Sequence, residues 1–224
     1  TMKFYTVYKD PRPIRLREAT RQFAYDSLEN HFYGQEAMKN FAVTMDHIEG
    51  FAELTPLEKE RLILREIAEK APVPLRYGEL LCGGARLGLA IQHLIPATYG
   101  GNPVFPSISH LTMQFSLVLE LGLNGLRRRV EESIKLHEGG VEIPFLENCL
   151  VALDAYKLWH GRYVDALENY VRAAEEDGVL PPCPAFEKIL QNLRRVPMEP
   201  PTSFHEAVQS LWMTFAFAPL TGNW

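Results

Sequence analysis

Residues 144–177 read PFLENCLVALDAYKLWHGRYVDALENYVRAAEED and decide the fold class. Large apolar and aromatic side chains recur along this stretch every three or four positions, the spacing that places them on one face of an α-helix. Gly178 follows at a position typical of a helix C-cap. The stretch therefore predicts one long helix with a buried stripe. The stripe consists of Leu146, Leu150, Leu153, Tyr156, His160, Tyr163, Leu167, Tyr170 and Ala174.

The sequence on both sides of this stretch also repeats at helical spacing, without convincing two-residue alternation. Glycine, proline or a capping residue separates the predicted helices. A loop rich in glycine and proline is predicted over residues 95–107, and Pro219 is predicted to end the last helix. We therefore predict a mainly α chain. The further predicted helices cover residues 15–33, 35–49, 56–71, 109–121, 124–137, 184–194 and 204–218.

Two of these helices begin with a capping box, in which a Ser or Thr and a Glu three residues later bond each other's backbone. The first is Thr55–Glu58 (TPLE) and the second is Ser203–Glu206 (SFHE). His205 and Glu206 could also begin a zinc-binding HExxH motif, but Gln209 stands where the second histidine is needed. The seven histidines show no other metal-ligand spacing. We therefore predict a helix cap here and no metal site.

The composition is that of an ordinary globular protein, for which we predict a cytoplasmic location. The chain has 224 residues, 46% apolar and 23% charged, and its net charge of −5 argues against binding of nucleic acid. Its three cysteines form neither a CxxC pair nor an even set, which is typical of a reducing compartment. Residues 87–119 and 207–224 carry no charge, but prolines interrupt both and neither contains a membrane-spanning run. No signal-peptide core occurs at the N-terminus.

Single residues give weaker indications of a site. Cys149 lies on an apolar helix stripe and is predicted to be a core residue, Cys183 falls in a proline-rich surface turn, and Cys82 is ambiguous. His110 follows the Gly/Pro loop in the first turn of a predicted helix, where a cleft could hold a polar substrate. The alternative is that His110 has a purely structural role. Arg127–Arg129 precede two glutamates and are predicted to form a solvated helix face.

Part of the long helix is similar to the middle of a tetratricopeptide repeat, which suggests a second class of function. The similarity consists of Gly161–Tyr163 followed by Ala166, Tyr170 and Ala173. Such repeats need about three copies to build a core, and the sequence contains one. A free-standing helical protein-interaction module is therefore the alternative function.

Five stretches, taken together and in order, resemble the N-terminal portion of a glycyl radical enzyme of the pyruvate formate-lyase-like family. The resemblance covers residues 55–224, and residues 1–54 match weakly as a helical lead-in. We therefore expect residues 1–224 to form a single N-terminal portion of such a domain. The stretches are residues 55–74, 78–84 (GELLCGG), 99–101 (YGG), 109–126 (SHLTMQFSLVLELGLNGL) and 200–212 (PPTSFHEAVQSLW).

The resemblance implies the helical part of a ten-stranded α/β barrel. Members pass a radical from a backbone glycine to a cysteine, which abstracts a hydrogen atom from the substrate in a buried site. The whole enzyme would be a lyase, dehydratase or decarboxylase that cleaves a C–C, C–O, C–N or C–S bond of a small polar molecule. A radical-SAM activase installs the glycyl radical, and the full-length enzyme is expected to form a homodimer.

The resemblance also implies what this chain supplies. The family's radical glycine and thiyl cysteine lie downstream of the fifth stretch, so we expect no catalytic residue here and no activity of the chain alone. His110 matches a position that faces the substrate in several relatives, and Tyr99, Phe105 and Asn223 are weaker candidates for the same wall. The apolar helix at 204–218 is expected to pack against the remainder of the barrel or a second copy.

Overall fold

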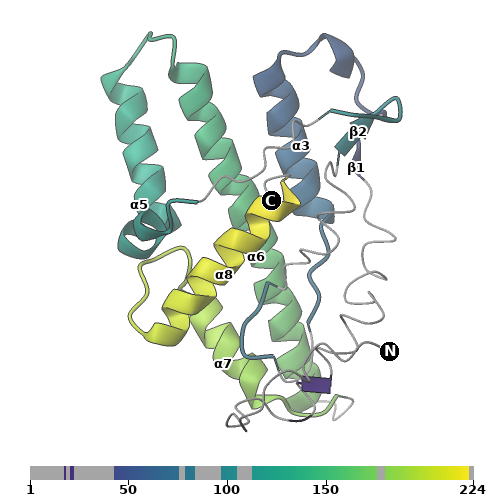
Figure 1. Ribbon diagram of the computed structural model, residues 1–224, viewed down its shortest axis with the longest axis vertical. Helices are drawn as coiled ribbons and strands as arrows, with labels where there is room; N and C mark the ends of the chain where they lie inside the picture. Colours follow the sequence, from purple (N-terminus) through teal and green to yellow (C-terminus); the bar gives the residue numbers. More distant parts are fainter. Residues whose placement is uncertain are drawn as a thin grey trace, which may run out of the picture.

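The long helix predicted over residues 144–177 is present as α6, Ile143–Glu175, which runs through the middle of the structure (Figure 1). The computed structural model describes residues 18, 21–22, 43–75, 79–83, 97–104, 113–175 and 180–221. Within these residues the fold is mainly helical, as predicted. The centre of the predicted stripe is buried, whereas its N-terminal part is only half-buried. The buried members are Tyr156, His160, Tyr163 and Leu167.

Helix α3, Pro56–Lys70, packs along α6 and begins with the predicted capping box. The Thr55 backbone N–H donates to Glu58 Oε2 at 2.8 Å, and the Glu58 N–H donates to Thr55 Oγ1 at 3.4 Å. Pro56 at the first helical position loses no hydrogen bond, because that N–H has no helical partner. The start of α3 is therefore fixed by its own sequence.

The opposite end of α3 is fixed by α6. The guanidinium of Arg162 donates to the backbone oxygens of Ala68 and Ala71 at 2.8 and 2.6 Å. These carbonyls lie at the end of α3, where a helix leaves acceptors without partners. Arg162 is therefore a side-chain cap on a neighbouring helix, which explains a charged residue in the repeat-like segment Gly161–Tyr163.

Helix α5, Phe115–Leu136, runs antiparallel to α6 and contains a break at Gly122. The two helices predicted on either side of this glycine are confirmed, since its φ of 61° and ψ of 174° are not helical. The first begins at Phe115 rather than at residue 109, and residues 109–112 lie outside the described part. Gly139, with a φ of 78°, lies in the turn that joins α5 to α6.

Helices α7, Pro184–Leu193, and α8, Phe204–Leu220, complete the helical part. Helix α8 extends one residue beyond Pro219, where it was predicted to end. It crosses the middle of the structure in contact with α5 and α7 (Figure 1). Met213 and Phe217 are consequently buried. The half-buried apolar side chains of α8 include Leu211, Trp212 and Phe215.

A small three-stranded sheet lies where the sequence predicted the end of a helix and a loop. Strand β1, Val43–Thr44, pairs in parallel with β2, Ala97–Tyr99, and β2 pairs antiparallel with β3, Asn102–Pro103. The helix predicted over 35–49 is therefore wrong at its C-terminal end, and the predicted 95–107 loop contains two strands. Strands of two or three residues are too short to show alternation. The β2–β3 turn uses Gly100 and Gly101, both with positive φ, as tight hairpins require.

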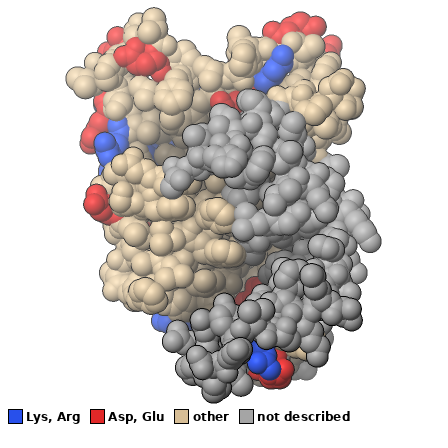
Figure 2. Space-filling view, viewed as in Figure 1, with Lys and Arg blue, Asp and Glu red and all other residues tan. Residues whose placement is uncertain are grey.

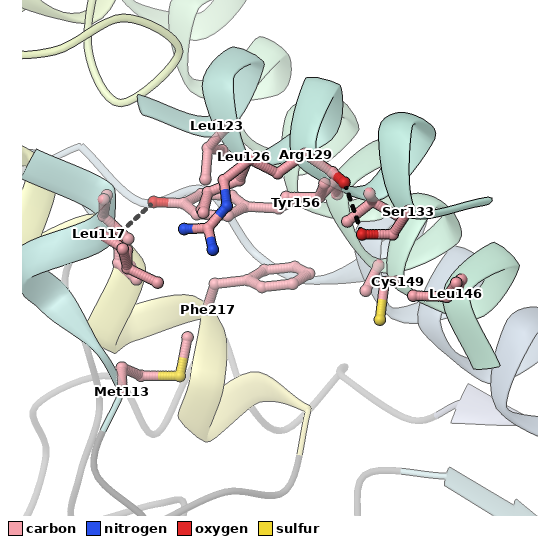
Figure 3. A pocket seen from close by; sticks show the side chains of 15 residues that line it. Met113, Leu117, Leu123, Leu126, Arg129, Ser133, Leu146, Cys149, Tyr156 and Phe217 are labelled. Atoms are coloured by element: carbon pink, nitrogen blue, oxygen red, sulfur yellow. Dashed lines mark hydrogen bonds between the residues drawn. The ribbon is translucent and has the colours of Figure 1, made fainter. Parts of the chain in front are cut away.

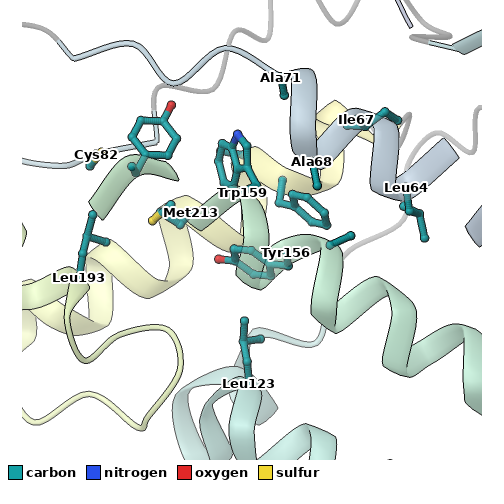
Figure 4. Close-up of a cluster of buried hydrophobic side chains, with 14 of the residues drawn as sticks. Leu64, Ile67, Ala68, Ala71, Cys82, Leu123, Tyr156, Trp159, Leu193 and Met213 are labelled. Carbon is teal, nitrogen blue, oxygen red and sulfur yellow. The ribbon is translucent and has the colours of Figure 1, made fainter. Parts of the chain in front are cut away.

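The core is built around aromatic side chains of α6 and α8 (Figure 4). The Tyr156 ring stacks on the Phe217 ring at 4.8 Å between centroids, and Trp159 meets Tyr163 edge-on at 5.0 Å. Ala68 of α3, Ala71 directly after α3 and Met213 of α8 lie around the same cluster (Figure 4). Trp159, which lies off the predicted stripe, is among the largest fully buried side chains.

Charged side chains lie mainly along one edge and at the upper ends of the face drawn in Figure 2. Several pair across elements, such as Arg61 of α3 with Glu147 of α6 at 3.0 Å. Arg194 pairs with Glu168 at 3.0 Å. Among the described residues, no helix combines the length and apolar character needed to cross a bilayer.

His160 makes the stability of this core dependent on pH. Its Nε2 lies 3.1 Å from the Val196 backbone oxygen, and burial lowers the pKa of its imidazole below the ordinary 6.5. The unfolded chain therefore binds a proton more readily than the folded chain. Stability should be complete above about pH 6.5 and should fall as the pH decreases through the unfolded pKa, by at most about 1.4 kcal/mol per pH unit.

Urea unfolding between pH 5 and 8 measures this effect. His160→Gln can still donate a hydrogen bond toward Val196 but cannot titrate, so its free energy of unfolding should fall less steeply below pH 6.5. Exposed His137 offers a matched control, and His137→Gln should keep the steep wild-type profile. Parallel profiles for wild type and His160→Gln would contradict the assignment.

Candidate functional site

The loop Leu80–Gly83 is held on helix α8 by His205 and by Gln209, which stands where a zinc-binding HExxH motif would have its second histidine. The Gln209 Nε2 donates to the Cys82 backbone oxygen at 2.8 Å, and its Oε1 accepts from the Cys82 N–H at 2.9 Å. The His205 Nε2 lies 2.7 Å from the Leu80 backbone oxygen. Gln209 is fully buried, so both hydrogen bonds are shielded from water. The side chains of His205 and Gln209, four residues apart on α8, thus hold this loop.

Gly83 allows this loop to approach α8 closely. Its φ is 95°, and an added Cβ would lie 2.9 Å from Cγ of Met213. A side chain at position 83 would therefore be strained and would also displace Met213. The backbone of the second stretch consequently lies directly on α8.

The start of α8 carries a cap that differs partly from the predicted capping box. The Glu206 N–H donates to Ser203 Oγ at 3.2 Å, as predicted. The Glu206 carboxylate, however, accepts from the N–H and hydroxyl of Thr202, at 2.6 and 2.9 Å. The Thr202 N–H is the main cause that lowers the pKa of Glu206, and Arg195 adds a favourable charge. The carboxylate thus fixes the chain one residue before the expected N-cap.

The break in α5 binds the turn that precedes α8. Beyond Gly122, the N–H groups of Leu123 and Asn124 donate to the backbone oxygens of Pro197 and Met198 at 2.9 and 3.0 Å. The Asn124 side chain donates to Glu199 Oε1 at 2.7 Å. These two N–H groups begin a helical segment and would otherwise have no partner. The fourth stretch is thereby connected to the turn at residues 197–199, directly before α8.

The second and fifth stretches, residues 78–84 and 200–212, meet on the N-terminal half of α8 through Cys82 and Gln209. Residues 122–124 of the fourth stretch contact the turn that leads into α8. The hydrogen bonds between Cys82 and Gln209 join positions that are 127 residues apart in the sequence. These contacts hold the loops around α8 in place.

Of the four predicted substrate-wall residues, Tyr99 lies in the described part. It belongs to β2, is half-buried, and its ring centroid is 5.0 Å from that of Phe51. This contact places the ring against the apolar core. His110, Phe105 and Asn223 lie outside the described residues, so their role as a substrate wall stays a prediction.

Two of the three cysteines differ in burial from what was predicted. The prolines around Cys183 are exposed, as expected for a surface turn, but the Cys183 side chain itself is buried in the core. Cys149 is half-buried, since it faces a pocket rather than the core. Cys82 is buried, and burial is the main cause that raises the pKa of both the Cys82 and Cys149 thiols. Neither thiol is therefore activated as a nucleophile.

An apolar pocket of about 470 Å³ lies between α5, α6 and α8 (Figure 3). The Tyr156 hydroxyl lies 3.2 Å from Thr214 Oγ1 in its wall, and Ser133 Oγ donates to the Arg129 backbone oxygen at 2.9 Å. Sequence reasoning missed this pocket because three separate helices contribute to it. The lining residues are Met113, Leu117, Val118, Leu123, Leu126, Arg129, Val130, Ser133, Leu146, Cys149, Ala152, Leu153, Tyr156, Thr214 and Phe217.

The tetratricopeptide-like segment does not form a repeat. A tetratricopeptide repeat is a helix–turn–helix unit, whereas Gly161–Tyr163 lies inside one continuous helix of 33 residues. Among the described residues, no group of three His, Cys, Asp or Glu side chains is arranged to hold a metal ion. The structure therefore does not favour a repeat-based interaction module.

Comparisons of sequence identify relatives. Residues 90–223 match the family model described as pyruvate formate lyase-like. The isethionate sulfite-lyase of Bilophila wadsworthia is 30% identical over 114 residues, which are 47% of this chain and 13% of that protein.

Solved structures share the fold. A Roseburia inulinivorans structure, described for 1,2-propanediol dehydration, matches with a TM-score of 0.65 and 16% identity over 95% of this chain and 34% of its own. The glycerol-bound B12-independent glycerol dehydratase of Clostridium butyricum matches with a TM-score of 0.59 and 15% identity over 83% of this chain and 31% of its own. A glycyl radical enzyme of Archaeoglobus fulgidus matches with a TM-score of 0.56 and 16% identity, over 83% and 33% respectively.

The chain thus spans about a third of these structures and a smaller share of the isethionate lyase. Its helices match part of the glycyl radical enzyme fold, as the sequence resemblance implied. Because the family model covers more than half of the chain, the chain belongs to the pyruvate formate lyase-like family of glycyl radical enzymes.

Proposed function

We propose that this chain is the N-terminal portion of a glycyl radical lyase, dehydratase or decarboxylase that acts on a small polar substrate. The whole protein would cleave a C–C, C–O, C–N or C–S bond by radical chemistry. This chain would supply helices that flank the barrel and one wall of the substrate pocket. The radical glycine and the thiyl cysteine would come from the rest of the protein.

The observation that carries this proposal is the family match over residues 90–223. The contacts around α8 give it a physical basis, because they hold the backbone at Leu80–Gly83 and Gly122–Asn124 in fixed positions. A radical intermediate needs a rigid site from which water is excluded. The buried hydrogen bonds between Cys82 and Gln209 are suited to that requirement.

We assign the wall of the pocket to His110, with Tyr99, Phe105 and Asn223 as weaker candidates. The whole protein would depend on a radical-SAM activase for its glycyl radical and would act as a cytoplasmic homodimer. The partly covered apolar side chains of α8 would pack against the remainder of the barrel or a second copy.

Anaerobic activation followed by electron paramagnetic resonance tests the proposal. The whole protein, incubated with its radical-SAM activase, should give a glycyl radical doublet, whereas this chain alone should give none. Absence of the signal from the activated whole protein, or a doublet assigned to a glycine of this chain, would overturn the proposal.

The role of His110 is tested in the same preparation. His110→Ala should still form the glycyl radical but turn over its substrate more slowly, because a pocket group orients the substrate. His205→Ala is the comparison variant, since His205 holds a loop backbone. Unchanged kinetics of His110→Ala would remove it from the pocket wall.

A further inference from the structure

The pocket between α5, α6 and α8 combines apolar walls with one positive charge, on Arg129, that has no carboxylate partner among the described residues. Its volume of about 470 Å³ lies within the range of small-molecule sites, which are mostly apolar with a few placed polar groups. Met113 at the pocket is 36% exposed and Arg129 is exposed, so the pocket is open to solvent. A molecule can therefore enter it without unfolding the helices.

The three consecutive arginines of α5 have different surroundings. Arg127 forms ion pairs with Asp154 and with Glu131, the latter at 3.7 Å. Arg128 is exposed and does not line the pocket. Arg129 lines the pocket, and its guanidinium points toward the surrounding side chains (Figure 3). Arg128 and Arg129 are exposed, as predicted for a solvated helix face. No carboxylate among the described residues pairs with the Arg129 guanidinium, so this group is available to an anionic ligand at the pocket.

We propose that this pocket binds a small amphipathic carboxylate, with the apolar body between the helices and the carboxylate on Arg129. A planar guanidinium binds a carboxylate through two parallel hydrogen bonds, which suits Arg129 to this group. The apolar body would contact Leu117, Leu153 and Phe217, which come from the three helices. Burial of apolar surface would provide most of the affinity, and Arg129 would provide selectivity for a negative charge.

This inference goes beyond the proposed function. Two of the related structures are described with 1,2-propanediol and glycerol, which are small polyols. The described pocket instead presents mostly aliphatic and aromatic side chains, with hydroxyls of Tyr156 and Thr214 that already face each other. A polyol would lose its hydrogen bonds to water there without replacing them. The chemistry of this pocket is therefore that of a ligand with an apolar body.

Calorimetric titration of the full chain with sodium decanoate tests the proposal directly. Decanoate should bind with a 1:1 stoichiometry, and decyltrimethylammonium, which has an alkyl chain of nearly the same length and the opposite charge, should bind much more weakly. Arg129→Gln should weaken decanoate binding about fivefold to tenfold, because one charge-assisted contact is lost. Arg128→Gln, on the adjacent exposed arginine, should leave the affinity unchanged.

Cys149 provides a second readout inside the pocket. It is half-buried and lines the pocket, whereas Cys82 and Cys183 are buried elsewhere in the core. Bound decanoate should slow alkylation of Cys149 by iodoacetamide, as measured by mass spectrometry, without changing the other two cysteines. Cys149→Phe should fill part of the pocket and lower the decanoate affinity, with circular dichroism used to confirm that the helices remain.

Three results would overturn the proposal. Equal binding of decanoate and decyltrimethylammonium would show that the pocket does not distinguish a negative from a positive head group. Equal decanoate affinity for wild type and Arg129→Gln would remove the assigned cation. Tight binding of an acidic, leucine-rich peptide that protects Cys149, with no binding of decanoate, would make the pocket a peptide-docking site instead.

Discussion

Gly122→Ala should lower the free energy of unfolding by about 3 kcal/mol or more, the largest effect expected from adding one methyl group to this chain. Two causes combine at this position. The φ of 61° and ψ of 174° form a conformation that only glycine adopts readily. In addition, a Cβ would approach the Met198 oxygen and lie 2.8 Å from the Glu199 carbonyl carbon. Both obstacles are backbone atoms that cannot rotate away.

Urea unfolding followed by circular dichroism measures this loss. Gly161→Ala is the matched control, because Gly161 lies inside α6 and has no obstructing heavy atom within 4 Å of an added Cβ. Alanine at that helical position should stabilise the chain by up to about 1 kcal/mol. The same substitution should therefore have opposite signs at the two sites. A Gly122→Ala protein as stable as wild type would show that the contact with Met198 and Glu199 is dispensable.

Gln209→Leu, which nearly preserves the size of the side chain, should lower the free energy of unfolding by about 2–4 kcal/mol. The leucine would fill much of the same space but would leave the N–H and C=O of Cys82 without partners in a buried place. Each unpaired buried group costs about 1–3 kcal/mol. The loss should therefore come from unmet hydrogen bonds rather than from an empty space.

The control for this prediction is Gln191→Leu on α7. Gln191 is exposed, so its substitution should change the free energy of unfolding by less than about 0.5 kcal/mol. Limited proteolysis adds a local readout, because release of Leu80–Gly83 from α8 should create a new cleavage site near that loop in Gln209→Leu only. If both leucine variants were equally stable, the hydrogen bonds between Gln209 and Cys82 would not contribute to the stability of the fold.

The long helices were predictable because their information is local. The spacing around Tyr156 and Tyr163 repeats over many turns, and Gly122 interrupts α5 at the position where the pattern breaks. Thr55 and Glu58 are three residues apart and bond within one turn of helix. Each of these features depends on neighbours in the sequence, so a single sequence contains what is needed to infer it.

The small sheet and the hydrogen bonds between Gln209 and Cys82 could not be inferred in this way. The pairing of Val43 with Ala97 joins strands too short to show a pattern. Gln209 could be recognised as the wrong residue for zinc, but its partner Cys82 lies 127 positions away. The pocket next to Arg129 combines three helices, and helical spacing does not tell which arginine of three points inward. These features depend on tertiary contacts, which one sequence alone does not reveal.

The hydrogen bonds between Cys82 and Gln209 also have a consequence for synthesis on the ribosome. A chain is made from its N-terminus at about 5–20 residues per second. The backbone at Cys82 therefore emerges several seconds before the amide of Gln209 exists, given their separation of 127 positions. During that interval the loop cannot adopt its final buried state. Translation of α8 is thus the step that allows the earlier half of the chain to complete its fold.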